Sequence, residues 1–247
     1  MDWVFDLGNT RLKCAPLHAD GSLGDVRAAV HGGVDPAQAC AAILPSRGDV
    51  AYLASVAAPA LTVGLLDALT QRFQRISIAR TQPAFAGLRI AYADPRKLGV
   101  DRFLALIGAR ALGTPALVVA VGTALTIDLL DADGRHHGGR IAPSPALMRE
   151  ALHARAGHLP VAGGTYAEFA NDTESALASG CDGAALALIE RSRQRADALL
   201  GALPRLLLHG GGAQALLPHL RDAGYAPRLV LEGLARWARI EAAAGAA

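Results

Sequence analysis

Cysteine, an excess of one charge and long apolar runs are all scarce in this sequence of 247 residues. The three cysteines, Cys14, Cys40 and Cys181, are odd in number and lack CxxC spacing, which argues against a disulfide framework or a zinc site. Lys and Arg (24) nearly balance Asp and Glu (22), and neither sign forms a long run. The charge pattern of a nucleic-acid-binding protein is therefore missing. A reducing cytoplasm and a partner other than nucleic acid fit best.

No targeting or membrane segment is expected. The N-terminal stretch MDWVFDLGN carries acidic residues where a signal peptide needs a basic start and an apolar stretch. The longest apolar run, residues 116–130, is interrupted by Gly122, Thr123 and Asp128 and is short for a bilayer span. This run is expected to form two buried strands joined by a turn, in a cytoplasmic protein that has no membrane contact.

Strand-like and helix-like patterns alternate along the chain, which predicts an α/β fold with mixed sheets. About half of the residues are hydrophobic, enough for a large core. Strands are expected at 2–6, 11–17, 25–30, 50–56, 87–92, 115–120, 124–131, 136–142, 204–209 and 228–231. Helices are expected at 36–44, 59–73, 101–112, 144–155, 173–200, 212–223 and 233–243. Gly113 and Pro115 end the helix before them and predict two domains, 1–114 and 115–247.

The two halves contain a weak internal repeat. VFDLGNT (4–10) can be laid over VVAVGTA (118–124), so that Gly8 falls on Gly122 and each copy reads strand, glycine turn, strand. A glycine turn can direct its amide N–H groups at one point and bind an anion, so two such turns could hold a polyphosphate from both sides. The alternative is a pair of ordinary hairpin turns, since Gly and Asn are common in turns for steric reasons.

An acid and a lysine flank the first turn. If that turn centres on Asn9 and Thr10, Asp6 and Lys13 lie opposite each other on paired strands, with side chains on the same face. The carboxylate could hold hydrated magnesium and the ammonium a phosphate, which suits phosphoryl transfer. The alternative is a surface ion pair, although an acid inside the apolar stretch WVFDL favours a function. No GxxxxGK[ST] motif is present, so a P-loop is not expected.

Four segments resemble the motifs of type III pantothenate kinases, in the order expected for that family. They are DLGNTRLK (6–13), KLGVDRFLALIGAR (97–110), VGTALTID (121–128) and LLLHGGGA (206–213). The family belongs to the acetate and sugar kinase, Hsc70 and actin superfamily. The resemblance implies two ribonuclease-H-like domains with mixed sheets, flanking helices and an ATP cleft between them. The first would carry the first phosphate motif and the pantothenate segment, and the second would carry the second phosphate motif, the adenosine motif and a dimer helix.

The resemblance also implies an activity, the ATP-dependent phosphorylation of pantothenate to 4′-phosphopantothenate in coenzyme A biosynthesis. Asp101 would be the general base that accepts the proton of the substrate hydroxyl. Without the family, an acid in a first helical turn reads more simply as a cap or a dipole partner. Asp6 would position Mg²⁺ through water. Asp128 also matches a family position, although it could only anchor its hairpin.

The remaining site residues follow from the same motifs. Those implied to bind the phosphates of ATP are Asp6, Leu7, Gly8, Asn9, Thr10, Arg11, Leu12, Lys13, Gly122 and Thr123. Those implied to bind pantothenate are Tyr92, Gly99, Val100, Asp101, Arg102 and Thr173. Thr173 would reach the site of a neighbouring subunit, so the resemblance implies a homodimer with shared active sites.

The chain departs from the family at two positions. Many relatives have an aspartate two residues before the glycine of the second motif, where it helps to bind a potassium or ammonium ion, and this chain has Ala120. A methyl group cannot coordinate a cation, so we expect little dependence on a monovalent cation. Ser144 stands where many relatives have a glycine.

Two other functions remain open at this point. A kinase for another small hydroxyl substrate would share the phosphate motifs but not the pantothenate segment. A regulatory or accessory protein could keep the fold without turnover, although Asp6, Lys13 and Asp101 argue against it. The spacing of His153, His158, His209 and His219 is not that of metal ligands. His136 and His137 would point to opposite faces of a strand. No histidine is expected to be catalytic.

Overall fold

The computed structural model describes residues 1–244, and the chain divides into two compact units. Unit 1 contains Met1–Leu112, Asp133–Arg135 and the chain from Arg228 onward, and unit 2 contains Gly113–Ala132 and His136–Pro227. The division after Leu112 lies close to the expected boundary at 114. The C-terminal end differs from the expectation of 115–247 as one domain, because the chain from Arg228 onward belongs to unit 1. Residues 245–247 of that range lie outside the described residues.

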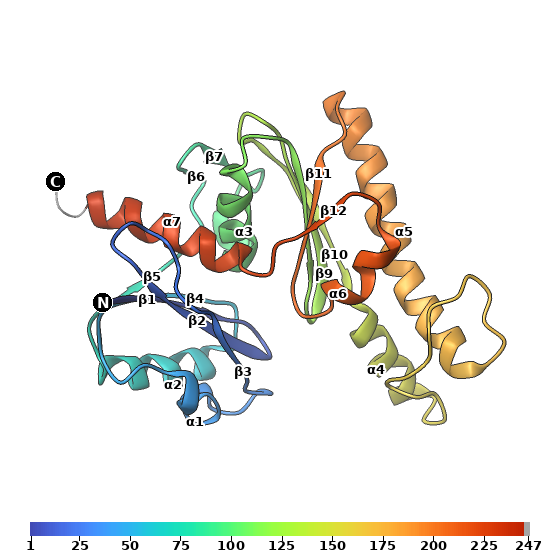
Figure 1. Ribbon diagram of the computed structural model, residues 1–247, viewed down its shortest axis with the longest axis horizontal. Coiled ribbons are helices and arrows are strands. Elements are labelled where there is room, and N and C mark those ends of the chain that lie inside the picture. The colour runs from blue at the N-terminus through green and yellow to red at the C-terminus, as the bar shows by residue number, and fades with distance from the viewer. Residues whose placement is uncertain (245–247) are drawn as a thin grey trace. The chain divides into compact units, whose positions relative to one another are not determined.

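Unit 1 is built on a five-stranded mixed sheet of order β3-β2-β1-β4-β5. Its strands are β1 (Asp2–Leu7), β2 (Arg11–Leu17), β3 (Arg27–Val30), β4 (Gly48–Ser55) and β5 (Phe73–Ile78). The first three run antiparallel, and β4 and β5 run parallel to β1. The helices are α1 (Pro36–Ala39), α2 (Pro59–Thr70), α3 (Val100–Arg110) and α7 (Leu229–Ala244), with 3₁₀ turns η1 (Ala41–Ile43) and η2 (Pro95–Lys97) and a small hairpin of β6 (Ala84–Phe85) and β7 (Leu88–Arg89). Helices α1 and α2 lie on one side of the sheet, and α3 and α7 lie on the other (Figure 1).

Unit 2 repeats the same sheet. Its strands are β8 (Ala116–Val121), β9 (Ala124–Leu130), β10 (His136–Pro143), β11 (Arg205–His209) and β12 (Ala223–Tyr225), in the order β10-β9-β8-β11-β12. The strand directions also match those of unit 1. Its helices are α4 (Pro145–Arg155), α5 (Thr173–Leu200) and α6 (Ala213–Leu216), followed by the 3₁₀ turn η3 (Leu217–His219). The weak repeat in the sequence is therefore confirmed as a repeat of topology.

Each unit has its own core. In unit 1 the strand residues Phe5, Leu7 and Leu12 pack with Leu65 and Leu69 of α2, and all five side chains are fully buried. In unit 2 the inward residues of β8, β9 and β11 pack against the apolar face of α5. Trp3, Phe5 and Leu7 of β1 alternate onto the face that packs against α2, and their burial there specifies the register of this strand.

Helix α7 explains the main error in the expected elements. The run 228–231 was expected to be a strand, and this was wrong, because Leu229 opens a helix whose buried residues continue at Leu234 and Ala238. A short apolar run alone does not separate strand from helix. The helix packs on α3 at Gly233, where an added Cβ would collide with the backbone carbonyl of Leu104. The short strands β5 and β12 were not expected.

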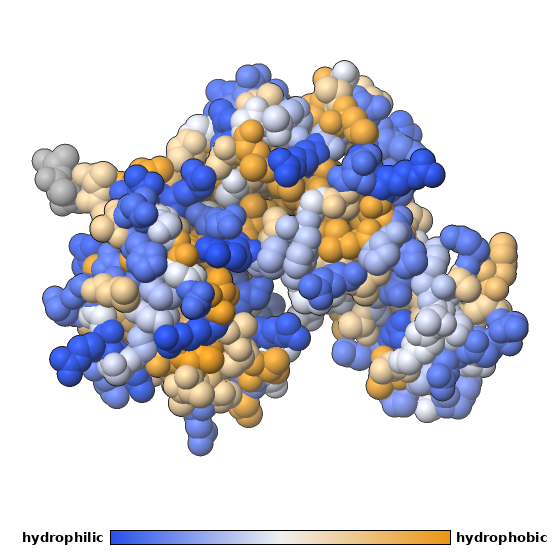
Figure 2. Space-filling view, in the orientation of Figure 1, coloured by the Kyte–Doolittle hydropathy of each residue, from blue (hydrophilic) through white to orange (hydrophobic). Residues whose placement is uncertain are grey.

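Apolar side chains reach the surface in several separate patches on the face seen in Figure 2, as is usual for folded proteins. Among residues 1–244, no helix is both long and apolar enough to span a bilayer.

Candidate active site

The first hairpin places an acid opposite a lysine. In the antiparallel pairing of β1 with β2, Asp6 is the partner of Lys13, and Leu7 is the partner of Leu12. The register expected from the sequence is therefore confirmed. Directly paired residues project to the same face of the sheet, so the carboxylate and the ammonium leave the hairpin together. The side chains of Leu7 and Leu12 face the core and are fully buried, so only their backbone groups could contact a phosphate.

The turn between these strands is held by its own backbone. The Gly8 N–H donates to the Arg11 carbonyl at 3.0 Å, so this amide closes the hairpin and is not one of the donors that the turn directs outward. Asn9, Thr10 and Arg11 are exposed at the tip. An added Cβ at Gly8 would lie 3.4 Å from the Arg11 carbonyl oxygen. This is an ordinary van der Waals distance, so space alone does not require a glycine at this position.

Burial and a neighbouring acid change the protonation of Asp6. The pKa of Asp6 is raised to about 6: burial raises it most, Lys13 lowers it, and the negative charge of Asp101 raises it. The fold of unit 1 therefore brings Asp101 within electrostatic reach of Asp6, although the two residues lie far apart in the sequence. A carboxylate that is desolvated and faces another carboxylate favours a bound cation, because a cation would relieve both penalties.

Asp101 lies in the first turn of α3, as expected from the sequence. Gly99 is the N-cap residue, and its carbonyl accepts the first helical bond from the Phe103 N–H at 3.0 Å. A Cβ added at Gly99 would lie 2.6 Å from Oδ1 of Asp101. Only a glycine leaves the Asp101 carboxylate in its observed place, and that carboxylate accepts a bond from the Arg102 N–H at 2.8 Å.

The two other polar residues expected at the substrate, Tyr92 and Arg102, contact each other. Nη1 of Arg102 donates to the Tyr92 hydroxyl at 3.3 Å, and the guanidinium carbon lies 5.8 Å from the centre of the Tyr92 ring. Arg102 is buried on α3. A buried guanidinium beside a phenol makes a rigid donor pair suited to a carboxylate or an amide oxygen.

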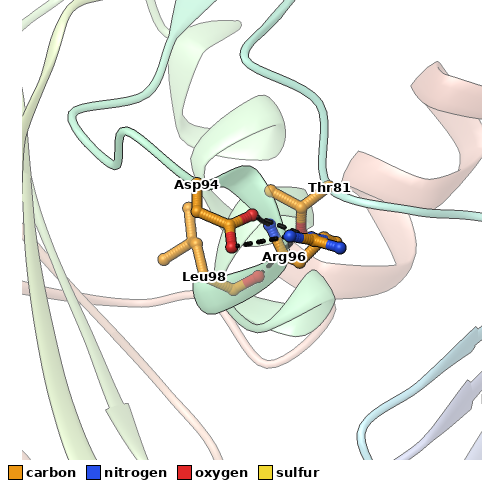
Figure 3. A network of polar contacts seen from close by, with 4 residues as sticks. All are labelled: Thr81, Asp94, Arg96 and Leu98. Carbon is orange, nitrogen blue, oxygen red and sulfur yellow. Dashed lines mark hydrogen bonds and ion pairs between the residues drawn. The ribbon is translucent and has the colours of Figure 1, made fainter.

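A polar network holds the loop that leads into α3 (Figure 3). The Asp94 carboxylate accepts from the Arg96 backbone N–H at 3.1 Å and from the Arg96 guanidinium at 3.0 and 3.1 Å, which caps the turn η2. The Thr81 hydroxyl donates to the Leu98 carbonyl at 2.8 Å. Both contacts fix the chain immediately before Gly99. No sequence pattern predicted a role for Thr81, which lies outside the motif along the chain.

In unit 2 the second hairpin is joined to the glycine-rich turn that follows β11. The Gly122 N–H donates to the Ala124 carbonyl at 3.0 Å, and the Gly212 N–H donates to the Val121 carbonyl at 2.9 Å. Gly210 has φ +93°, and a Cβ there would collide with the Val121 backbone. The second phosphate motif and the glycine-rich turn, which are about 85 residues apart along the chain, are therefore neighbours within unit 2.

Thr123 is exposed at the tip of this hairpin, and its backbone is bound by Ser144. The Ser144 hydroxyl donates to the Thr123 carbonyl at 3.0 Å and accepts from the Leu147 N–H at 3.3 Å as the cap of α4. The sequence patterns predicted no role for Ser144, which here joins the second hairpin to the start of α4.

Ala120 occupies the position in unit 2 that Asp6 occupies in unit 1. Asp6 pairs with Lys13 on one side and Ala54 on the other, whereas Ala120 pairs with Thr126 and His209. The frame is the same, but no carboxylate stands at this position.

Asp128 lies inside its unit, in a pair with a histidine. Its Oδ1 lies 2.9 Å from Nε2 of His136, and both side chains are buried. This geometry favours the structural alternative, in which Asp128 anchors the hairpin. Thr173 is exposed in the first turn of α5, beside the Asp172 cap that accepts from the Ser175 N–H at 2.8 Å.

Magnesium fits the acidic pair of unit 1. Among residues 1–244, no group of three or more His, Cys, Asp or Glu side chains gathers to hold a metal. Mg²⁺ in kinases is typically bound by one or two carboxylates together with water and phosphate oxygens. The desolvated Asp6, with the charge of Asp101 nearby, matches that donor set.

Comparison with known proteins gives a consistent result. The sequence profile of the type III pantothenate kinase family matches residues 3–195. The type III pantothenate kinase of Stenotrophomonas maltophilia strain K279a is 63% identical over 237 residues, which cover 96% of this chain and 97% of the relative. That of Xanthomonas campestris pv. campestris strain B100 is 60% identical over 243 residues, which cover 98% and 99%.

Two solved structures match in fold at low identity. One, from Campylobacter jejuni, is described as belonging to the Baf family of transcriptional activators (TM-score 0.65, 20% identity, 97% of this chain and 98% of that chain). The other, from Sinorhizobium meliloti, is described as a 2-dehydro-3-deoxygalactonokinase (TM-score 0.58, 17% identity, 97% and 99%). At these identities the likeness concerns the fold alone.

The fold is that of the two-domain acetate and sugar kinase, Hsc70 and actin class, in which a sheet of this topology occurs in each half. Within that class, the chain belongs to the type III pantothenate kinase family.

The raised pKa of Asp6 predicts how the stability of the protein depends on pH. Its pKa is raised in the folded protein, so between about pH 4 and pH 6 the native state binds more protons at Asp6 than the unfolded chain does. The contribution of Asp6 to the free energy of unfolding therefore falls as pH rises through this range. We expect Asp6→Asn to be more stable than the natural chain at pH 7.5, with little difference at pH 4.

Urea unfolding between pH 4 and pH 8 measures this. The exposed Asp67 of α2 provides the control, since Asp67→Asn makes the same change of charge at the surface. A stability difference between Asp6→Asn and the natural chain that stays constant with pH would contradict the raised pKa of Asp6.

Proposed function

We propose that this protein transfers the γ-phosphate of ATP to the primary hydroxyl of pantothenate and forms 4′-phosphopantothenate, the first step of coenzyme A biosynthesis. One observation carries the proposal. Asp6 pairs with Lys13 across the hairpin, and the charge of Asp101 acts on Asp6; an ammonium and two carboxylates suit the charge neutralisation and proton transfer of a kinase. High identity to type III pantothenate kinases over nearly the whole chain supports the choice of substrate.

The phosphates of ATP are bound by the hairpin tips. Lys13 offers an ammonium, and the exposed turn residue Asn9 offers a backbone amide at the first turn, next to Thr10. Gly122 and Thr123 would contact the phosphates at the second turn, where the Gly122 N–H already closes the hairpin on the Ala124 carbonyl. Asp6 would hold Mg²⁺ through water, and the ion would neutralise charge on the phosphates.

Asp101 accepts the proton. As the hydroxyl oxygen of pantothenate forms a bond with the γ-phosphorus, the bond from that phosphorus to the β,γ-bridging oxygen breaks and ADP leaves. The hydroxyl proton passes to the Asp101 carboxylate. Gly99 leaves room for this carboxylate, and the Arg102 N–H holds its Oδ1. Val100 and the Arg102–Tyr92 pair form the adjoining surface for pantothenate.

The three cysteines are free and buried, which fits a protein of a reducing compartment. We therefore place the enzyme in the cytoplasm.

Asp101→Asn tests the reaction directly. The amide keeps the size of the side chain but cannot take a proton, so we expect kcat to fall by about 10²- to 10⁴-fold. ATP- and magnesium-dependent formation of phosphopantothenate by the purified protein is the measurement. Asp67→Asn is the matched control and should keep full activity.

An inactive natural protein, with and without potassium or ammonium, would contradict the kinase function. The accessory-protein function or another hydroxyl substrate would then be preferred. Full activity of Asp101→Asn would agree with the kinase function but would show that Asp101 is not the general base.

The alanine at position 120 predicts that activity depends little on monovalent cations. No carboxylate stands at the second-sheet position that corresponds to Asp6, so we expect activity to change little when sodium is replaced by potassium or ammonium. Titration of KCl at constant ionic strength measures this. Ala120→Asp restores an oxygen ligand and should gain potassium activation. Strict and saturable activation of the natural protein by potassium would refute the prediction.

A homodimer with shared sites is the assembly that we propose. Helix α5 has 28 residues, and an open groove of about 800 Å³ beside it is lined by small residues such as Ala176, Gly180 and Gly183. Phe169, at the edge of this groove, is 99% exposed. A fully exposed aromatic side chain next to a groove is suited to contact with a second subunit.

Mixing two inactive variants tests the sharing. Asp101→Asn and Thr173→Ala are combined by refolding or co-expression. If Thr173 serves the partner's site, each mixed dimer regains one intact site, and the mixture should recover about a quarter of the natural activity. If Thr173 serves its own subunit, the mixture gains nothing over Thr173→Ala alone. Light scattering should give a mass near twice 25.4 kDa.

A further inference from the structure

His31 is a buried histidine beside the first phosphate turn, and only 2% of its surface is exposed. It follows β3, at the point where that strand ends next to the tip of the β1–β2 hairpin. Its backbone N–H donates to the Thr10 carbonyl at 2.9 Å, and the Gly32 N–H donates to the same carbonyl at 3.3 Å. The main chain at His31 therefore supports the turn from the outer side of the sheet.

The imidazole makes a second connection to the turn. Its Nε2 lies 3.0 Å from the Gly8 carbonyl oxygen, and its Nδ1 lies 3.2 Å from the Gly33 backbone nitrogen. A backbone N–H can only donate, so Nδ1 must be the acceptor and carry no proton. Nε2 then carries the proton and donates it to Gly8. The neighbours define one tautomer of a neutral ring.

The two glycines after His31 make this arrangement possible. Gly32 has φ +58° and Gly33 has φ +86°, both in the region that favours glycine. The Val34 N–H closes the turn on the His31 carbonyl at 3.0 Å. This tight turn brings the Gly33 N–H back onto the ring and fixes its orientation.

The bond to Gly8 has a consequence for the next residue. The Gly8 C=O and the Asn9 N–H belong to one planar trans peptide unit, so they point in opposite directions. A carbonyl held by His31 therefore turns the Asn9 amide away from the ring. The Gly8 N–H is already used by the Arg11 carbonyl, so both peptide groups of Gly8 are fixed.

We propose that His31 is a positioning residue that orients the Asn9 amide of the first turn toward the phosphates of ATP. The inference rests on the proposed kinase function. His31 itself contacts neither substrate. Because it acts on the phosphate turn, its loss should weaken the binding of ATP and leave the binding of pantothenate unchanged.

His31→Met and His31→Gln form a matched pair. Glutamine and methionine have equal length, but only glutamine places an N–H donor where Nε2 stands. For His31→Met we expect the Kd and the KM of ATP to rise about threefold to tenfold, the usual effect of one lost hydrogen bond, with the KM of pantothenate unchanged. His31→Gln should stay close to the natural protein.

Two controls separate positioning from loosening of the fold. His18→Met changes an exposed histidine of the same unit and should have no effect. Leu65→Ala removes a buried side chain from α2, so it should lower the melting temperature without raising the Kd of ATP. ATP binding is measured by calorimetry without pantothenate, so its result does not depend on turnover.

The outcomes are distinct. If His31→Met binds ATP as the natural protein does, or if His31→Gln is impaired as much as His31→Met, the Gly8 bond has no positioning role and the inference is overturned. If the natural protein binds ATP but does not phosphorylate pantothenate, the proposed function fails, while the calorimetric comparison still decides the role of His31.

Discussion

The pairing of β1 with β2 in one register is the constraint on which the site depends. Leu7 and Leu12 pair with each other and are fully buried in the core of unit 1. A shift of one strand by one residue would move the buried leucine of that strand to the opposite face and remove it from this core. The same register places Asp6 opposite Lys13 and leaves Asn9 at the exposed tip. Core packing thus fixes the position of the charged groups, and the polar residues need not specify it themselves.

Three of the four motifs are held in the same way. Beside each of the three, a side chain from another segment donates to a backbone carbonyl: His31 to Gly8, Thr81 to Leu98 and Ser144 to Thr123. Motif glycines allow close approach of the backbone, but they also add conformational freedom that would weaken a binding site. A hydrogen bond from a well-packed neighbour removes part of that freedom before any ligand arrives. This pre-organisation lowers the entropic cost of binding a phosphate or a substrate.

The duplicated sheet shows how one frame supports different chemistry. Both units have the same strand order and directions, yet Asp6 in the first corresponds to Ala120 in the second. The second unit keeps the same sheet without this carboxylate, because the register there depends on buried apolar residues such as Val119 and Ile127. The acid function is therefore concentrated in unit 1, where burial and the charge of Asp101 raise the pKa of Asp6 to about 6.

The sequence by itself determined the class of fold, the hairpin register, the first turn of α3 at Asp101 and the family, because alternation, turn residues and motif order are local patterns. It misassigned residues 228–231 as a strand, since a short apolar run fits both kinds of element until α3 supplies the surface that α7 covers. Only the tertiary structure decided the proximity of Asp101 to Asp6 and the backbone contacts of Thr81, Ser144 and His31. Those contacts join segments that are distant along the chain, and their geometry exists only after the core has packed.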